Sequence, residues 1–261
     1  MISDYNKYCP QGKIEAEYLI NVHGVKDQDL CKLGMIWLRN FEKTKAYKRK
    51  GLKSTSKKVI LYAGNSPNFF SNDSEICAID RILKEIDSGK LQSIRLIYRP
   101  VGLNQNRIRK LKDKYKENEL FEIQIPQVSM LGIEQKILNS SMYEIEEYAE
   151  QMGEADLLIM SAGTTMAFDA LSMDIPCISN FTNSGRKRTN EYLTGDEFFI
   201  PAVSNGLRVV YTLDDLIDKI IVSIDDPGAT LSVKKGVFDQ WDYNNKEYAA
   251  DFLMMIKSLL K

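Results

Sequence analysis

The sequence predicts a doubly wound α/β fold, a Rossmann-like parallel sheet that occupies the chain from about residue 58 onward. Short apolar runs, typical of buried strands, alternate there with segments whose apolar residues recur at helical spacing. Right-handed crossovers place the intervening helices on the faces of such a sheet. The pattern therefore excludes most all-α and all-β folds.

In the first half of this region, apolar runs rich in β-branched and aromatic residues predict three strands, at 59–63, 94–98 and 121–125. Two helices are expected between them. Apolar residues at helical spacing indicate a helix over 76–86, which Gly89 closes, and a charged stretch predicts a surface helix over 104–116.

The second half repeats the unit. A capping box at 141–144 begins a helix that ends at Gly153. The remaining strands are expected at 156–160, 176–179 and 208–211. The remaining helices are expected at 165–172, at 212–226, with a cap at 212–215, and at about 245–260.

A basic segment separates this region from the start of the chain. Residues 43–58 contain eight lysines and arginines and no acidic residue. We expect a remnant of a second, N-terminal domain at 1–42, a basic linker at 43–57 and the Rossmann-like domain at 58–261. The basic segment is either a solvated linker or a patch attracted to anionic lipid, where each basic residue contributes about 1 kcal/mol.

The composition argues against several classes of function. Lysine plus arginine number 35 against 36 acidic residues, which gives no reason to expect nucleic acid as a partner. The four cysteines lie far apart without a C-x-x-C pair, which argues against a zinc site and a disulfide framework. No apolar run approaches the roughly 20 residues of a membrane span. We expect a cytoplasmic protein, which the basic segment would hold at the inner membrane face.

Other catalytic classes lack their motifs. The G-x-S-x-G elbow of serine hydrolases and the P-loop do not occur. The acidic pair Asp27 and Asp29 does not follow an apolar strand, so an exposed turn is the better interpretation. We predict no metal and no cofactor.

Two loops are the strongest candidates for a binding site. In the strand order 3-2-1-4-5-6, the first and fourth strands are neighbours and ligands bind in the crevice where they end. The loops that follow these strands are Gly64-Asn65-Ser66-Pro67 and Ser161-Ala162-Gly163-Thr164-Thr165. The second opens into a helix, so backbone amides and hydroxyls would face an anion there.

Each site residue has a simpler alternative. Thr164 can cap the helix without any ligand, because threonine is a good N-cap residue. Asp169 lies one turn into the same apolar helix and needs a polar partner, since burying an unpaired carboxylate is costly. That partner is either a ribose hydroxyl or a local salt bridge.

Residues 154–176 resemble the donor-binding, C-terminal half of GT-B-fold glycosyltransferases. The shared features are an aspartate before the strand, a hydroxyl-rich loop that opens a helix, the pair Asp169-Ala170, and Pro176 before the next strand. Within this group the chain is most similar to bacterial surface-polysaccharide transferases and CDP-glycerol glycerophosphotransferases. Residues 34–37 and 208–216 resemble two further elements of those proteins.

The resemblance implies a set of donor-nucleotide contacts. Ser161, Gly163, Thr164 and Thr165 would contact phosphate, and Asp169 would contact the ribose. Gly64, Asn65 and Ser66 would line the facing side. Arg99 lies where relatives place a basic loop.

Two departures limit what the resemblance implies. Relatives commonly carry histidines in the basic loop and in a later element, whereas this chain has Arg99-Pro100-Val101 and, at 196–199, no histidine. The one histidine, His23, precedes the basic segment, where a surface or packing role is favoured. We also expect the chain to keep only the final stretch of the N-terminal acceptor domain that relatives carry. The sequence therefore names no catalytic residue.

The function expected from these features is that of a donor-binding half of a glycosyltransferase or glycerophosphotransferase. It would use a UDP- or CDP-linked donor in surface polysaccharide biosynthesis, together with a complementing acceptor domain or subunit. Two alternatives stay open. One is a nucleotide-sugar 2-epimerase-like protein, and the other is a non-catalytic nucleotide-binding module.

Overall fold

The computed structural model describes residues 7–35, 57–65, 72–100, 105–125, 142–182, 200–226, 228–241 and 247–259. Within these ranges the chain forms a six-stranded parallel sheet in the order β3-β2-β1-β4-β5-β6. The strands are β1 (Lys58–Ala63), β2 (Ile94–Arg99), β3 (Phe121–Ile123), β4 (Leu157–Ser161), β5 (Cys177–Asn180) and β6 (Arg208–Val210). The predicted fold class and strand order are confirmed.

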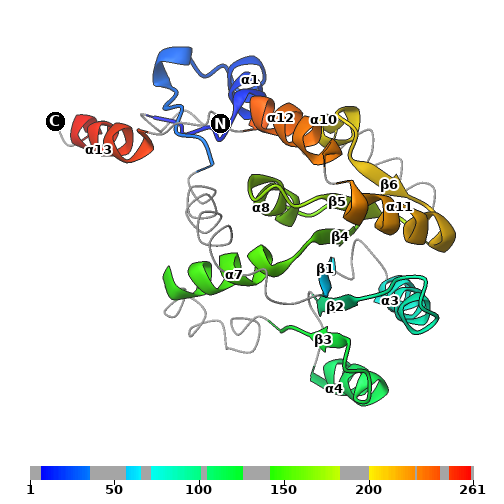
Figure 1. The fold of residues 1–261 in the computed structure, drawn as a ribbon. Helices are drawn as coiled ribbons and strands as arrows, with labels where there is room; N and C mark the ends of the chain where they lie inside the picture. Colours follow the sequence, from blue (N-terminus) through cyan, green and yellow to red (C-terminus); the bar gives the residue numbers. More distant parts are fainter. Residues whose placement is uncertain are drawn as a thin grey trace.

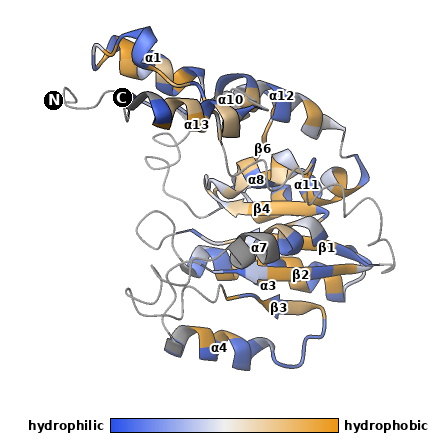
Figure 2. Cartoon of the chain, turned by 90° about the vertical axis from the view of Figure 1, so that its left-hand side faces the viewer, coloured by the Kyte–Doolittle hydropathy of each residue, from blue (hydrophilic) through white to orange (hydrophobic). Residues whose placement is uncertain are grey.

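The two central strands are buried on both faces. Every residue of β4 is buried, and so is every residue of β1 after Lys58. Tyr62 in β1 is in register with Tyr98 in β2 and Ile159 in β4. Such continuous apolar runs are typical of parallel strands that helices cover on both sides. Figure 2 shows the predominantly apolar colouring of β4.

One face of the sheet is covered by α3 (Asn72–Asp87), α4 (Gln105–Tyr115) and α11 (Leu213–Asp225). The apolar side chains predicted on the first of these helices, including Ile79, Leu83 and Ile86, pack against Ile60 and Tyr62. The Thr212 side chain caps α11 by accepting a hydrogen bond from the Asp215 amide at 3.1 Å. That predicted cap is confirmed.

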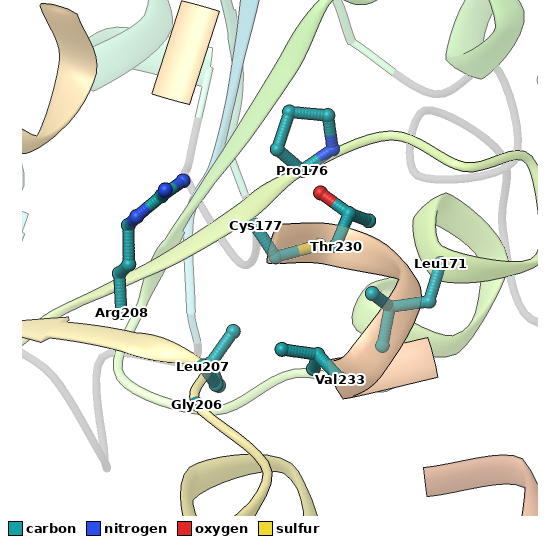
Figure 3. A pocket seen from close by; sticks show the side chains of 8 residues that line it. All are labelled: Leu171, Pro176, Cys177, Gly206, Leu207, Arg208, Thr230 and Val233. Atoms are coloured by element: carbon teal, nitrogen blue, oxygen red, sulfur yellow. The ribbon is translucent and has the colours of Figure 1, made fainter. Parts of the chain in front are cut away.

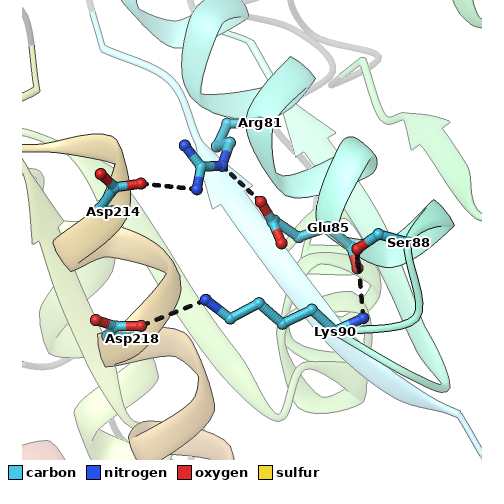
Figure 4. Close-up of polar contacts among 6 residues, drawn as sticks. All are labelled: Arg81, Glu85, Ser88, Lys90, Asp214 and Asp218. Carbon is cyan, nitrogen blue, oxygen red and sulfur yellow. Dashed lines mark hydrogen bonds and ion pairs between the residues drawn. The ribbon is translucent and has the colours of Figure 1, made fainter.

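Ion pairs join two of these helices (Figure 4). Arg81 on α3 reaches Asp214 on α11 at 2.7 Å, and Lys90, just after α3, reaches Asp218 at 3.5 Å. The aspartates are exposed, so each pair contributes no more than about 1 kcal/mol. Their main effect is to fix where α11 lies against α3.

The opposite face carries α7 (Met142–Glu154), α8 (Met166–Ser172) and α12 (Ala229–Trp241), as Figure 1 shows. The short helix α10 (Ile200–Ser204) contacts α12. Ser141, the first residue of the predicted capping box, lies outside the described residues. Helices on both faces complete the doubly wound arrangement.

The first part of the chain packs on this second face. It contains α1 (Lys13–Asn21) and the 3-10 turn η1 (Asp27–Asp29), and α1 contacts α12. Asp27 is exposed, as expected for a turn. The last helix, α13 (Tyr248–Leu259), lies beside this part of the chain (Figure 1). The predicted basic linker, apart from residue 57, lies outside the described ranges.

None of the described helices combines the length and the apolar composition that a membrane crossing requires.

Candidate functional site

The two predicted loops meet where β1 and β4 end side by side. Ala63 and Met160 are in register at the carboxyl ends of these strands. The side-chain amide of Asn65 donates hydrogen bonds to the backbone oxygens of Ser161, at 2.9 Å, and Gly163, at 3.2 Å. The loop after β1 is therefore fastened directly to the loop after β4. Ser66 lies outside the described residues.

A buried carboxylate holds the β1 loop from the other side. Glu75, in the first turn of α3, is 1% exposed. It accepts a hydrogen bond from the backbone amide of Asn65 at 2.7 Å and another from the Tyr98 hydroxyl at 2.6 Å. The Gly64 amide bonds to the backbone oxygen of Arg99 at 2.9 Å. The carboxylate thus ties the loop to α3 and β2.

A second set of buried polar groups lies beneath the β4 loop. The hydroxyl of Tyr62 accepts hydrogen bonds from the side chains of Asn180, at 2.8 Å, and Ser161, at 3.2 Å. All three residues are completely buried. Burial, and after it the negative charge of Glu75, raises the pKa of Tyr62 well above its ordinary value. Tyr62 is therefore a neutral hydrogen-bonding group and no acid or base at neutral pH.

The backbone of the β4 loop turns at Ala162. This residue has φ +57°, in the left-handed region that disfavours alanine. Its amide donates to the Asn180 oxygen at 2.9 Å, and its own oxygen accepts from the Ser179 hydroxyl at 2.8 Å. These bonds to β5 hold the turn in place.

The residues after this turn are the accessible part of the loop. Gly163 and Thr164 are half-buried and Thr165 is exposed, whereas the Ser161 hydroxyl points into the core. The Thr164 hydroxyl accepts a long hydrogen bond, 3.4 Å, from the Met166 amide. The N-cap residue of α8 is Thr165, so this bond is a local turn contact of Thr164. Thr165 makes no side-chain cap.

Arg99 and Asp169, which the sequence analysis treated separately, are linked through Tyr148. The Arg99 guanidinium lies 4.7 Å above the Tyr148 ring, and the Tyr148 hydroxyl donates to Asp169 at 2.7 Å. Arg99 also donates to the side chains of Gln124 and Gln151, each at 3.1 Å. Burial and the Asp169 carboxylate raise the pKa of Tyr148. Asp169 is 8% exposed, so a tyrosine supplies the polar partner that its burial demands.

Sequence reasoning missed four residues of this site, namely Tyr62, Glu75, Tyr148 and Asn180. A signal existed for one of them. Glu75 falls at helical spacing with Ile79 and Ile82, so it lies on the buried side of α3. Tyr62 could not be distinguished from other apolar strand residues, because only the fold brings its hydroxyl to Asn180.

A small cavity lies at the amino edge of the sheet, the end at which the strands begin. A cavity of about 10 Å³ lies at the starts of β5 and β6, lined in part by Cys177, Leu207 and Thr230 (Figure 3). This volume suits a single water molecule and no larger ligand. Burial raises the pKa of the Cys177 thiol.

Metal-binding groups and the histidine give no further site. The described residues contain no group of three or more histidine, cysteine or acidic side chains placed to hold a metal ion. His23 is exposed after α1, where its ring makes an edge contact with Tyr18 at 5.1 Å.

Comparison with known proteins identifies the fold. No protein-family model matches the chain, and no curated protein matches it significantly. A solved structure of Methanocaldococcus jannaschii UDP-GlcNAc 2-epimerase with UDP-GlcNAc and UDP matches with a TM-score of 0.57 and 14% identity, over 97% of this chain and 61% of that one. The wall teichoic acid polymerase TagF matches with a TM-score of 0.61 and 15% identity, over 99% and 60%.

A third structure, S. aureus MnaA with UDP, matches with a TM-score of 0.58 and 13% identity, over 98% and 60%. At these identities the likeness shows the fold, which is the Rossmann-like GT-B type predicted from the sequence. The chain spans about three fifths of the length of these structures.

Proposed function

We propose that the chain binds a nucleotide-diphosphate donor where β1 and β4 end, as the donor-binding half of a glycosyltransferase or glycerophosphotransferase. The observation that carries this proposal is the direct bracing of the two loops by Asn65. It fixes the accessible residues Gly163, Thr164 and Thr165 at the switch point of a doubly wound sheet. In open α/β sheets, ligands bind outside the carboxyl ends of the strands at such a point.

The solved structures support the class of ligand. The M. jannaschii epimerase structure contains UDP-GlcNAc and UDP, the S. aureus MnaA structure contains UDP, and a TagF crystal was soaked with CDPG. A UDP- or CDP-linked donor is therefore the ligand that we assign to this chain. Surface polysaccharide biosynthesis is the process in which such transfer would take place.

Each site residue then has a separate task. Gly163, Thr164 and Thr165 would contact the diphosphate, while Asp169 would hold the ribose. Ser161 and Asn65 already bond to protein groups, so we assign them to holding the loops. Gly64, Ser66 and Arg99 stay assigned to the facing side.

The chemistry would rely on stabilisation of the leaving nucleotide. As the bond between the transferred group and the nucleotide breaks, negative charge grows on the phosphate oxygens, and fixed hydrogen-bond donors at the loop favour that charge. The buried tyrosines of the described site are neutral. A complementing acceptor domain or subunit would therefore supply the acid and base groups, and the basic segment at 43–57 would bring the chain to anionic membrane.

The two other functions differ in their products. A 2-epimerase, favoured by the similarity to the epimerase structures, would convert a UDP-sugar without an acceptor. A non-catalytic module, favoured by the missing histidines, would bind nucleotide without turnover. Product analysis with a complementing domain separates these outcomes.

Donor binding can be tested by thermal unfolding against nucleoside diphosphates and their sugar or glycerol derivatives. A ligand at 100 times its Kd stabilises the fold by about 2.7 kcal/mol. We expect this shift with a uridine or cytidine ligand, and we expect the Thr164→Val/Thr165→Val variant to lose it. Thr230→Val, at the opposite edge of the sheet, is the matched control and should keep the shift. No shift with any nucleotide would refute the proposal.

A further inference from the structure

In the first part of the chain, two short stretches run side by side. Tyr8 and Leu30 form a parallel bridge. The Tyr8 amide donates to the Asp29 oxygen at 2.9 Å, and the Cys31 amide donates to the Tyr8 oxygen at 2.7 Å. One step further along, the same register places Cys9 beside Cys31.

The bridge places the two thiols side by side, and neither is in a disulfide. Cys9 is exposed and Cys31 is half-buried. Neighbouring strands lie about 4.8 Å apart, which falls inside the range of Cα separations that disulfides span. A bond between these sulfurs would therefore need little movement of the backbone.

We propose that Cys9 and Cys31 form a thiol pair that a small-molecule disulfide oxidises to an intramolecular disulfide. This inference does not depend on nucleotide binding. No local pattern indicated the pair, because the two cysteines are far apart along the chain and belong to no short motif.

A pocket gives an oxidant access to one member of the pair. It has a volume of about 440 Å³, and Lys7, Cys31, Lys32 and Met254 are among the residues that line it. Lys32 is paired with Asp27 at 3.0 Å, so Lys7 is the cation that suits an oxidant carrying carboxylates, such as glutathione disulfide. Asp27 and Asp251 also line the pocket. Both thiols are accessible, and we assign the first attack to Cys31 because it lines this pocket.

The reaction proceeds by two thiol–disulfide exchanges. The Cys31 thiolate attacks one sulfur of glutathione disulfide, which forms a mixed disulfide and releases one glutathione thiolate. The Cys9 thiolate then attacks the Cys31 sulfur and releases the second glutathione. Both cysteines are oxidised, one glutathione disulfide is reduced to two thiols, and the two protons go to the released glutathione.

Burial and, after it, the local charges make this exchange slow at neutral pH. Burial raises the pKa of both thiols, and the nearby negative groups Cys31 and Glu15 raise that of Cys9 further, as Asp251 does for Cys31. Lys7 acts in the opposite direction on Cys31. Only the thiolate attacks, so the rate of disulfide formation should rise about tenfold from pH 7 to pH 8.

Oxidation would also alter the contact with the last helix. The Cys9 sulfur lies 3.5 Å from the Met255 sulfur of α13, as the donor of an S–H hydrogen bond. A disulfide has no S–H group. The oxidised pair therefore loses this bond to α13.

The test treats the full chain with glutathione buffers of increasing disulfide fraction, then traps free thiols by alkylation and maps peptides by mass spectrometry without reduction. We expect a Cys9–Cys31 cross-linked peptide pair that lacks two hydrogens and disappears on reduction. Cys9→Ser should instead leave glutathione attached to Cys31. Cys77→Ser removes an exposed thiol elsewhere and should leave the cross-link unchanged.

Two results would overturn the proposal. One is wild-type protein in which Cys9 and Cys31 are separately alkylated or separately glutathionylated at every buffer ratio. The other is a cross-link that joins either of them to Cys77 in preference to the other. Because the wild-type chain carries the decisive measurement, a variant that fails to fold would not affect it.

Discussion

The end of the sheet where the strands stop (the carboxyl edge) and the end where they start (the amino edge) differ in how their polar side chains are arranged. At the carboxyl edge, hydrogen bonds join Tyr62 to Ser161 and Asn180, and Tyr98 to Glu75, all deep in the interior. At the amino edge, the one buried space noted above is a water-sized cavity, and the charged pair of Lys58 and Asp156 is partly exposed. The amino edge also holds a partly buried hydrogen bond, from Arg208 to Ser223 at 2.8 Å, but among the described residues it is at the carboxyl edge that buried bonds lie beneath the accessible loop at 163–165.

The difference indicates where function lies. Buried polar groups cost free energy unless they are paired, and even a satisfied network is often no more stable than an apolar core. A sheet selected for stability alone has no need of Glu75 beneath a loop. Departures from the most stable sequence are expected at functional sites, and here they accumulate where the donor would bind.

The largest effect is expected from Glu75→Ala. The change leaves the Asn65 backbone amide and the Tyr98 hydroxyl without their buried acceptor, and the loss of hydrogen bonds to a buried charged group costs about 3 kcal/mol. We expect the free energy of unfolding, measured in urea, to fall by about that amount. The β1 loop should also lose its position, so nucleoside diphosphate should bind at least tenfold more weakly.

Glu85→Ala is the matched control on the same helix. Glu85 makes an i, i+4 ion pair with Arg81 at 2.8 Å; the pair is partly exposed on the helix surface, and i, i+4 pairs contribute about 0.2–0.5 kcal/mol. Equal losses of stability in the two variants would contradict the special role assigned to the carboxyl edge.

Tyr62→Phe should have the next largest effect. It removes the acceptor that Asn180 and Ser161 share, and unsatisfied buried donors cost about 1–3 kcal/mol. The matched control is Tyr211→Phe, whose side chain is half exposed and should change stability by less than about 0.5 kcal/mol. A Tyr62→Phe variant as stable as wild type would show that the network is dispensable.

The sequence predicted the sheet order but only part of the site. Alternating strand and helix patterns sufficed for the order, because a parallel sheet with right-handed crossovers leaves few arrangements. The loops at Gly64 and Ser161 were found for the same reason. The proximity of Tyr62 to Asn180, or of Cys9 to Cys31, depends on which distant segments of the chain become neighbours in the fold. Local sequence patterns do not predict such neighbours.

Alkaline pH offers a test of the buried phenols. The pKa of Tyr62 and that of Tyr148 are raised in the folded protein, mainly by burial, so each phenol ionises first in the unfolded chain. The contribution of these phenols to the free energy of unfolding is therefore fully present below pH 10, the ordinary tyrosine pKa, and is lost as the pH rises above it. Unfolding curves from pH 9 to 11 should show a fall of about 1 kcal/mol per phenol at pH 11. The fall should be smaller in Tyr62→Phe, and an equal fall would contradict the assignment.

The smallest effect on stability is expected when residues with a left-handed backbone conformation are replaced by glycine. These replacements also compare the two edges directly. Ala162 at the carboxyl edge and Ser93 before β2 at the amino edge both have φ +57°. Glycine accepts this conformation without strain, and left-handed alanine costs about 1 kcal/mol. Part of that gain is offset because glycine makes the unfolded chain more flexible.

Ala162→Gly and Ser93→Gly should therefore change the free energy of unfolding by similar amounts, within about 1 kcal/mol of wild type. Their effects on ligand binding should differ. Ala162→Gly loosens the turn that aims Gly163 and Thr164, so we expect nucleoside diphosphate affinity to fall severalfold by calorimetry. Ser93→Gly should bind as wild type does. If both variants keep full affinity, the turn at Ala162 serves folding alone, and the site depends on Asn65 and Glu75 for its geometry.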